Sequence, residues 1–264
     1  MHLNSVRDLK LATVEKLILG SPVLEDFKTV GTFDHSKKFL RVCSETLKRI
    51  HINGYTHVVI DAPLLQCLRV MVYLPKDLKI INLGSSTKLD INIHYGNNVY
   101  DRSFICDFLT IVSRFRDVVI SDVDWKGLIR YSEPGPLLQL QNIFRLNVKF
   151  SNYDLEMLPT ILESCPKLES LILELVGHNK NTELKVAFPR VPACLGSSLK
   201  FVDFKRSSKG FEGEMELVRY FLKNSAILDM LRLDLYHTKK AKCAFFQELV
   251  AMPRCSSACK VIVL

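Results

Sequence analysis

The sequence predicts an α/β protein in which short repeats stack into a curved parallel sheet, with short helices on its outer side. Its 264 residues are 48% hydrophobic and 24% charged, the composition of a chain that folds around a continuous core. Two stretches align without gaps, SCPKLESLILEL at 164–175 and NSAILDMLRLDL at 224–235. Shorter copies are SPVLEDFKTV at 21–30 and APLLQCLRVMV at 62–72. The shared form is Pro-x-Leu-x-x-Leu-x-Leu, with Ala226 in place of proline in the second stretch and looser apolar matches in the shorter copies, and it indicates a repeat protein.

The spacing within one repeat has a physical reason. Alternating apolar residues such as Leu171 and Leu173 turn one face of a short strand inward. Leu168 packs the turn beneath the strand, and proline ends the preceding helix because it cannot continue the helical hydrogen bonds. Successive strands are mostly about 20 to 30 residues apart, the range of leucine-rich repeats, so the predicted fold is an irregular leucine-rich-repeat solenoid.

The remaining elements follow in chain order. A first strand is expected around Leu3 to Val6. Weaker copies of the strand pattern are Leu47/Ile50/Ile52, Leu78/Ile81/Leu83, Leu89/Ile91/Ile93, Val118/Ile120, Leu146/Val148/Phe150 and Leu199/Val202/Phe204. Helical apolar stripes, expected to pack on the strand layer, are Val14/Leu17/Ile18, Phe104/Ile105/Phe108/Leu109/Val112 and Leu217/Val218/Phe221/Leu222. Pro159 suits the first turn of a further short helix.

The net charge is +8, and most of the excess lies between residues 188 and 264, where 13 Lys/Arg face 7 Asp/Glu. Such a surface favours acidic partners or nucleic acid. Aromatic residues are not interleaved with the basic ones, as base stacking requires. A solvated face is therefore the simpler interpretation, and nucleic acid is the less favoured partner.

The sequence predicts an intracellular protein, in the cytoplasm or the nucleus. The apolar stretch at 58–74 is interrupted by charged and polar residues, so no membrane span and no membrane partner are predicted. The first ten residues lack the apolar core of a secretory signal. Eight widely spaced cysteines without that signal indicate reduced thiols.

Four stretches resemble the plant F-box proteins with leucine-rich repeats. LNSVRDLKLATVEKLILGSPVLEDF (3–27) and GYTHVVIDAPLLQCLRV (54–70) are similar to their repeat region. VPACLGSSLKFVDFKRSSKGFEGEMELVRYFLKNSAILDMLRL (191–233) looks like the FBD domain that ends these proteins, and MPRCSSACKVIVL (252–264) resembles their terminus. The resemblance implies degenerate repeats over residues 1–187, and an FBD domain over 188–264 that continues and caps the solenoid.

The resemblance also implies a function. Such a chain is the part of an F-box protein that selects a target protein for an SCF ubiquitin ligase, and it has no catalytic role. In the family an F-box precedes the repeats and docks on the SCF adaptor. Here Met1 stands directly before a predicted strand and no F-box is recognisable, so the adaptor is expected as a partner only if a longer form supplies the F-box.

Two explanations of that departure stay open. The chain is either a truncated gene product or fragment, or a family member that has lost adaptor binding. The strand around Leu3 to Val6 would then be an open sheet edge, which we expect to fray or self-associate.

The sequence does not identify the target protein, but it predicts residues of the surface that binds the target. Polar residues that alternate with buried leucines are the candidates for partner binding. They are Glu169, Glu174, Arg232 and Asp234, with Trp125 as an aromatic anchor; a solvated role for the four polar residues and a packing role for Trp125 are the alternatives.

Enzymatic and ligand-binding functions find little support, and neither a cofactor nor a metal is expected. Cys255 and Cys259 have no second pair of ligands nearby, and zinc requires four. A thiol site of Cys67, His57 and Asp61 is conceivable, but the alternation around these residues suits ordinary strands. No phosphate-binding glycine motif is present. Besides the ligase receptor, the alternatives are a scaffold or decoy without an F-box and a basic nucleic-acid-binding surface.

Overall fold

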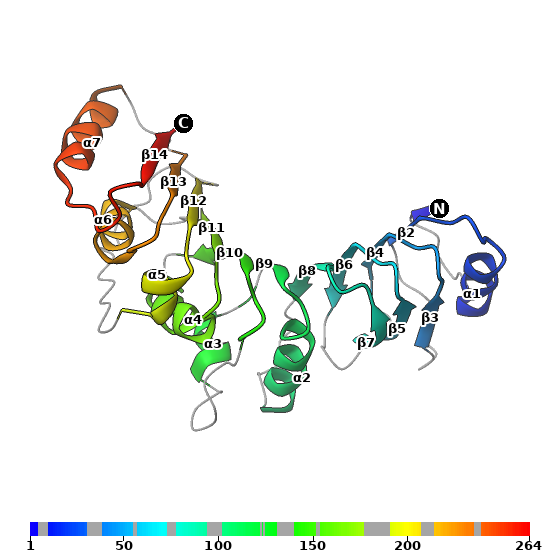
Figure 1. The fold of residues 1–264 in the computed structure, drawn as a ribbon. Coiled ribbons are helices and arrows are strands. Elements are labelled where there is room, and N and C mark those ends of the chain that lie inside the picture. The colour runs from blue at the N-terminus through cyan, green and yellow to red at the C-terminus, as the bar shows by residue number, and fades with distance from the viewer. Residues whose placement is uncertain are drawn as a thin grey trace. The chain divides into compact units, whose positions relative to one another are not determined.

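The computed structural model describes most of the chain. The described residues are 1–4, 10–30, 39–54, 57–72, 78–93, 102–121, 123, 125–130, 140–151, 154–176, 191–206, 214–234 and 239–264. The chain divides into two compact units, Met1–Val123 and Asp124–Leu264. Each unit contains a parallel sheet with short helices packed beside it (Figure 1). The predicted domain boundary at 187/188 lies outside the described residues.

The first unit is built on a parallel sheet of six strands in the order β1-β2-β4-β6-β8-β9. The strands are β1 (His2–Asn4), β2 (Asp26–Val30), β4 (Arg49–Asn53), β6 (Cys67–Val72), β8 (Lys88–Ile93) and β9 (Asp117–Ser121). One transverse row of side chains, Phe27, Ile50, Leu68, Leu89 and Val118, is almost completely buried. Regular alternation of buried and exposed positions therefore forms the core as predicted.

A second parallel sheet of three strands lies in the same unit, in the order β3-β5-β7. Its strands are β3 (Phe39–Cys43), β5 (His57–Ala62) and β7 (Leu78–Leu83), and they alternate along the chain with the strands of the first sheet. Figure 1 shows them as a separate layer beside β2, β4 and β6. The assignment of 78–83 to the single large sheet was therefore wrong.

The strand β7 is also irregular. Its pairing with β5 shifts by one residue, because Ile60 faces Ile80 whereas Asp61 faces Asn82. Ile81 is the extra residue of this β-bulge, and its side chain is 48% exposed. The prediction that Ile81 faces the core was wrong for this reason.

Two helices belong to the first unit, α1 (Leu11–Leu19) and α2 (Arg102–Val112). The helix α1 buries Leu11, Val14 and Ile18, one stripe at helical spacing. Leu17 is 43% exposed, so its predicted place on the buried stripe was wrong. In α2, Ile105, Phe108 and Val112 are buried as predicted; the side chain of Phe104 lies outside the described residues.

The second unit carries five parallel strands in sequence order, β10 to β14. They are β10 (Arg145–Ser151), β11 (Ser170–Val176), β12 (Phe201–Arg206), β13 (Met230–Leu233) and β14 (Lys260–Val263). The helical elements are α3 (Trp125–Arg130), η2 (Leu155–Met157), α4 (Leu158–Ser164), α5 (Ala193–Ser197), α6 (Glu214–Asn224) and α7 (Lys239–Ala251). The α4 to α6 helices lie along one side of the strands (Figure 1).

The repeat pattern is visible in the strand register. The step between paired positions ranges from 18 residues (Arg49 to Cys67) to 31 residues (Ser170 to Phe201). In the two best sequence copies, every repeat leucine that the structure describes inside a strand or its turn is buried: Leu168, Leu171, Leu173, Leu175, Leu228, Leu231 and Leu233. The predicted α/β class with a parallel sheet and short helices is confirmed, and both units are consistent with leucine-rich repeats.

None of the helices in the described part of the chain has the length and hydropathy of a membrane span.

Candidate protein-binding face

Along each strand the side chains point alternately into the core and to the surface. The surface-facing side chains form a polar face on the larger parallel sheet of the first unit and on the sheet of the second unit. In the first unit we call this the first face, and its rows run across neighbouring strands. One row contains Lys28, His51, Arg69 and Asp90, and the next contains Asp26, Arg49, Cys67, Lys88 and Asp117. Because a parallel ladder places successive repeats in register, residues distant in sequence become neighbours here.

Opposite charges on neighbouring strands pair on the first face. The Arg49 guanidinium donates to both carboxylate oxygens of Asp26, the second contact being 2.6 Å from Nη2 to Oδ2. The Arg69 Nε lies 2.6 Å from Asp90 Oδ2. The pair of Arg49 and Asp26 is largely exposed, so it fixes side-chain directions more than it stabilises the fold, whereas Asp90 of the other pair is mostly buried.

His51 is a half-buried residue in the row of charges on the first face. Burial lowers the pKa of this imidazole, and the positive charges of Arg69 and Lys28 lower it further. His51 therefore remains neutral at neutral pH, with one ring nitrogen able to accept a hydrogen bond.

The polar face of the second unit, here called the second face, has a different composition. Its central row runs from Asn147 through Ile172, Asp203 and Arg232 to Ile262. The adjacent row contains Phe201 and Met230, which are half-buried. Ile262 is 38% exposed. Arg232 thus has Met230 and Ile262 as apolar neighbours beside Asp203, and arginine, methionine and other large side chains are enriched at protein–protein interfaces.

An ion pair of unequal burial lies at the centre of the second face. The Asp203 side chain is 1% exposed and that of Arg232 is 38% exposed. The guanidinium donates two hydrogen bonds, one from Nε to Oδ1 of 3.0 Å and one from Nη2 to Oδ2. This bidentate contact raises the pKa of Arg232 above its ordinary value. Arg232 is therefore held in one orientation while part of it stays open to a partner.

The four polar residues predicted from the sequence lie on or beside the second face. Arg232 is at its centre. Glu174 is half-buried and stands between Lys149 and Lys205 in the register. Asp234 is exposed directly after β13. Glu169 precedes β11 at the edge, 3.7 Å from the ammonium of Lys200.

Sequence reasoning missed the other residues of the second face. They are Asp203 and the apolar Ile172, Phe201, Met230 and Ile262. The alternation of the strands places all of them on the surface side, so the same pattern that indicates Glu174 and Arg232 also indicates these residues.

Trp125 is a core residue, so its prediction as an anchor for a partner was wrong. Its side chain is 1% exposed and stacks on Phe150, with ring centroids 5.7 Å apart. Burial of this large ring stabilises the second unit by removing apolar surface from water. The alternative that the sequence left open, a packing role, describes its place better.

The thiol site considered from the sequence is not assembled. Cys67 lies on β6 of the large sheet, whereas His57 and Asp61 lie on β5 of the small sheet. Burial raises the pKa of the Cys67 thiol, which disfavours the reactive thiolate. Within the described residues, no group of His, Cys, Asp and Glu side chains has the arrangement of a metal site.

Comparisons with known proteins add a domain and a set of relatives. The FBD domain family matches residues 190–233. This segment contributes β12, α6 and β13, and with them Phe201, Asp203, Met230 and Arg232 of the second face. The match lies within the 188–264 segment for which an FBD domain was predicted.

The relatives are proteins of Arabidopsis thaliana. One F-box/FBD/LRR-repeat protein is 52% identical over 271 residues, which cover all of this chain and 62% of that protein. A second is 39% identical, again over the whole chain and 62% of its own length. A third is 36% identical over the whole chain and 63% of its length.

The chain thus spans about three-fifths of the length of the curated relatives that it matches. No solved structure matches the chain significantly.

Proposed function

The chain is a homologue of the plant F-box/FBD/LRR-repeat proteins and carries an FBD domain, and from that premise we propose that it is a protein-interaction module without catalytic activity. Its role is that of the receptor part of an SCF ubiquitin ligase, which recognises a target protein. The module acts inside the cell, where its unpaired cysteines stay reduced.

The composition of the second face is the observation that supports this proposal most. Arg232 is oriented by a buried carboxylate and has Met230 and Ile262 as partly exposed apolar neighbours. A partner that covers Ile262, Met230 and Arg232 would bury apolar area and pair with an already oriented guanidinium. Both contributions favour binding to protein surfaces, because ordering the arginine on binding loses little entropy.

The mechanism of such a module is positioning. Parallel strands pair along their whole length, so the second face is stiff, and a target bound to it is held at a fixed place relative to the rest of the ligase. The ubiquitin transfer itself belongs to other subunits. The chain contributes affinity and orientation only.

A pull-down with the SCF adaptor tests the ligase part of the proposal. Residues 1–264 are compared with the same chain joined to the F-box of one of its relatives. We expect adaptor binding by the extended chain, which would make 1–264 a receptor part. Failure of the extended chain to bind would favour the scaffold or decoy, in which partners are bound without delivery to the ligase.

Two isoleucines of nearly equal exposure allow a matched test of the second face. Ile262 on the face is 38% exposed, and Ile227, which lies in the turn before β13, is 36% exposed. Both are changed to Lys, and proteins captured from plant extract are quantified for each variant. We expect Ile262→Lys to lose specific partners that Ile227→Lys and the unchanged chain retain. Equal capture by all three would contradict the proposed face.

A further inference from the structure

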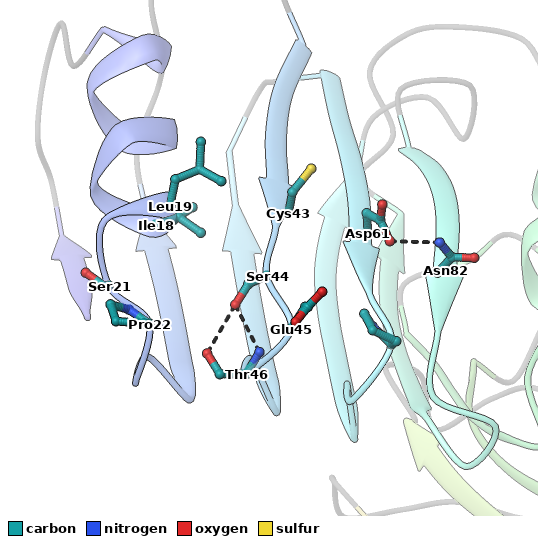
Figure 2. Close-up of a pocket in the computed structure, with 11 residues that line it drawn as sticks. Ile18, Leu19, Ser21, Pro22, Cys43, Ser44, Glu45, Thr46, Asp61 and Asn82 are labelled. Atoms are coloured by element: carbon teal, nitrogen blue, oxygen red, sulfur yellow. Dashed lines mark hydrogen bonds between the residues drawn. The ribbon is translucent and has the colours of Figure 1, made fainter.

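A pocket of about 590 Å³ lies in the first unit, beside the small sheet, and shares no lining residue with the first face. Its floor is formed where β3, β5 and β7 end, and the end of α1 forms one wall (Figure 2). The size falls within the range of small-molecule sites. Ligands of parallel sheets commonly bind outside the carboxyl ends of strands, which is where this pocket lies.

A row of three functional side chains crosses the floor of this pocket. Cys43, Asp61 and Asn82 occupy paired positions on β3, β5 and β7. The Asn82 amide donates a 2.9 Å hydrogen bond to Asp61 Oδ1, which fixes both side chains (Figure 2). The second carboxylate oxygen of Asp61 has no part in that contact.

The β-bulge of β7 is what completes the row. If the register continued without the bulge, Asp61 would face the apolar Ile81 instead of Asn82. The Arg114 guanidinium donates to the carbonyl oxygens of Ile80 and Ile81, at 2.8 and 3.4 Å, and so holds the bulged backbone. Bulges often redirect a side chain toward a site.

The rest of the pocket combines apolar walls with hydroxyl groups and a second carboxylate. Ile18, Leu19, Pro22 and Pro63 form the apolar part. The turn after β3 contributes Ser44, Glu45 and Thr46. Ser44 and Thr46 are held in place by contacts with each other, and Thr46 also donates a 2.9 Å hydrogen bond to the Leu24 carbonyl.

Among the residues that the structure describes, the charged side chains that line the pocket are Asp61 and Glu45, both acidic. The Arg114 guanidinium lies outside this lining and is engaged by the carbonyl oxygens of Ile80 and Ile81. Arg41 and Lys79 stand one step back along their strands, roughly 7 Å from the row. Burial raises the pKa of Cys43, with Asp61 adding to the effect, so the thiol is a neutral group of the floor.

From this arrangement we infer that the pocket binds a small organic cation, an ammonium or guanidinium group carried on an apolar body. The cation lies between the carboxylates of Asp61 and Glu45, and the apolar body packs on Leu19, Pro22 and Pro63. This site is independent of the proposed protein-binding function, because it shares no residue with either polar face.

An NMR titration of residues 1–264 tests the inference. The probes are 2-phenylethylamine, its neutral analogue 2-phenylethanol and the anion phenylacetate. We expect saturable shifts of the amide signals of residues 43–46, 61 and 82 with the amine, and affinities at least about fivefold weaker for the other two. Equal binding of the alcohol, or no saturable binding of the amine, would overturn the inference.

A pair of matched variants separates the pocket from general charge effects. Glu45→Gln combined with Asp61→Asn removes both pocket carboxylates and keeps an acceptor for Asn82. Glu25→Gln combined with Asp90→Asn removes two carboxylates elsewhere in the same unit. The first should weaken amine binding at least about fivefold and the second should leave it unchanged. If both double variants weaken amine binding equally, the amine responds only to the net charge of the protein, and the proposed site does not exist.

Discussion

Asp203 is a carboxylate that the fold can bury only because one neighbour compensates its charge. The side chain is 1% exposed and accepts two hydrogen bonds from Arg232. A buried anion without a partner loses its hydration and gains nothing in return. Arg232 therefore has two roles. It compensates the charge of the buried Asp203, and it is also the residue that a partner would contact.

Removing Arg232 should reveal the first role. We expect Arg232→Ala to reduce the free energy of unfolding by about 1–3 kcal/mol, because it leaves Asp203 buried and unpaired. Arg49→Ala, which breaks an exposed pair on the first face, should have a smaller effect. Chemical denaturation of both variants measures the difference. Equal losses would show that the burial of Asp203 has no energetic consequence.

His51 should make stability depend on pH. Burial, Arg69 and Lys28 lower its pKa in the folded chain below the ordinary value of 6.5. Between the folded pKa and about 6.5 the unfolded chain binds more protons, so stability rises with pH in that window and is lost as the pH falls through it. His51→Gln should flatten the dependence in the window below about pH 6.5.

Urea denaturation of the unchanged chain and of His51→Gln at several pH values measures this dependence. An equally steep curve for His51→Gln would contradict the role of His51.

Single residues were the least predictable level of this molecule. Polar residues of the second face could be named from strand alternation, because the period of two is strict there. Trp125 could not be placed, because its burial depends on Phe150, a contact between elements that periodicity does not encode. Asp203 was missed because a charged residue in a strand is ordinarily expected in water.

At the scale of elements, the turn between β7 and β8 leaves no space for a side chain at Gly84. A Cβ atom on Gly84 would lie 2.5 Å from the Leu65 carbonyl oxygen and 3.2 Å from that of Pro63. Thr87 closes the same turn, since its hydroxyl lies 2.6 Å from the Leu65 carbonyl oxygen. The backbone of this turn thus packs directly against the backbone of the turn that contains Pro63 and Leu65.

This close contact predicts a sensitive glycine. We expect Gly84→Ala to lower the free energy of unfolding by about 1–3 kcal/mol, because the clash is with backbone that cannot move alone. Gly196→Ala in α5 is the control, since nothing lies within 4 Å of its added Cβ atom. It should be neutral or up to about 1 kcal/mol more stable, as alanine favours helix. A neutral Gly84→Ala would show that the turn relaxes.

At the scale of elements, prediction succeeded for the core strands and failed for their distribution between sheets. The buried rows through Leu171 and Leu231 followed directly from the repeat. Strands β3, β5 and β7 alternate in the same way as their neighbours, and alternation alone cannot say which sheet a strand joins. The bulge at Ile81 could not be foreseen either, because it depends on Arg114, more than thirty residues later.

At the scale of the whole molecule, several basic residues are paired with carboxylates. In the second unit Lys200 pairs with Glu169, Arg219 with Glu248 and Arg232 with Asp203. Cations that are individually compensated make a weak binding surface for a polyanion.

This distribution predicts poor nucleic-acid binding in spite of the charge of +8. We expect fluorescence anisotropy with single- and double-stranded oligonucleotides to show little binding and a flat dependence on salt. Several released counterions would instead give a steep loss of affinity with rising salt. That steep dependence would restore the nucleic-acid-binding alternative.

The edge of the first sheet predicts a gradient of local stability. In residues 1–264 the strand β1 pairs with β2 and stands at the end of the strand order. We expect amide exchange in β1 to be faster than in β4 or β6, which are paired on both sides. Hydrogen-exchange mass spectrometry of a dilute sample measures this. Strong protection of β1 in a monomer would contradict the expected fraying.

The alternation of the strands divides their positions into two groups that differ in how far packing restricts substitution. Inward positions such as Leu171 are fixed by packing, whereas outward positions such as Ile172 contribute little to folding and are free to drift. A duplicated gene could therefore acquire a new partner by substitutions on one face without first acquiring compensating changes in its core. Asp203 and Arg232 are the exception, because either one can be exchanged safely only together with the other.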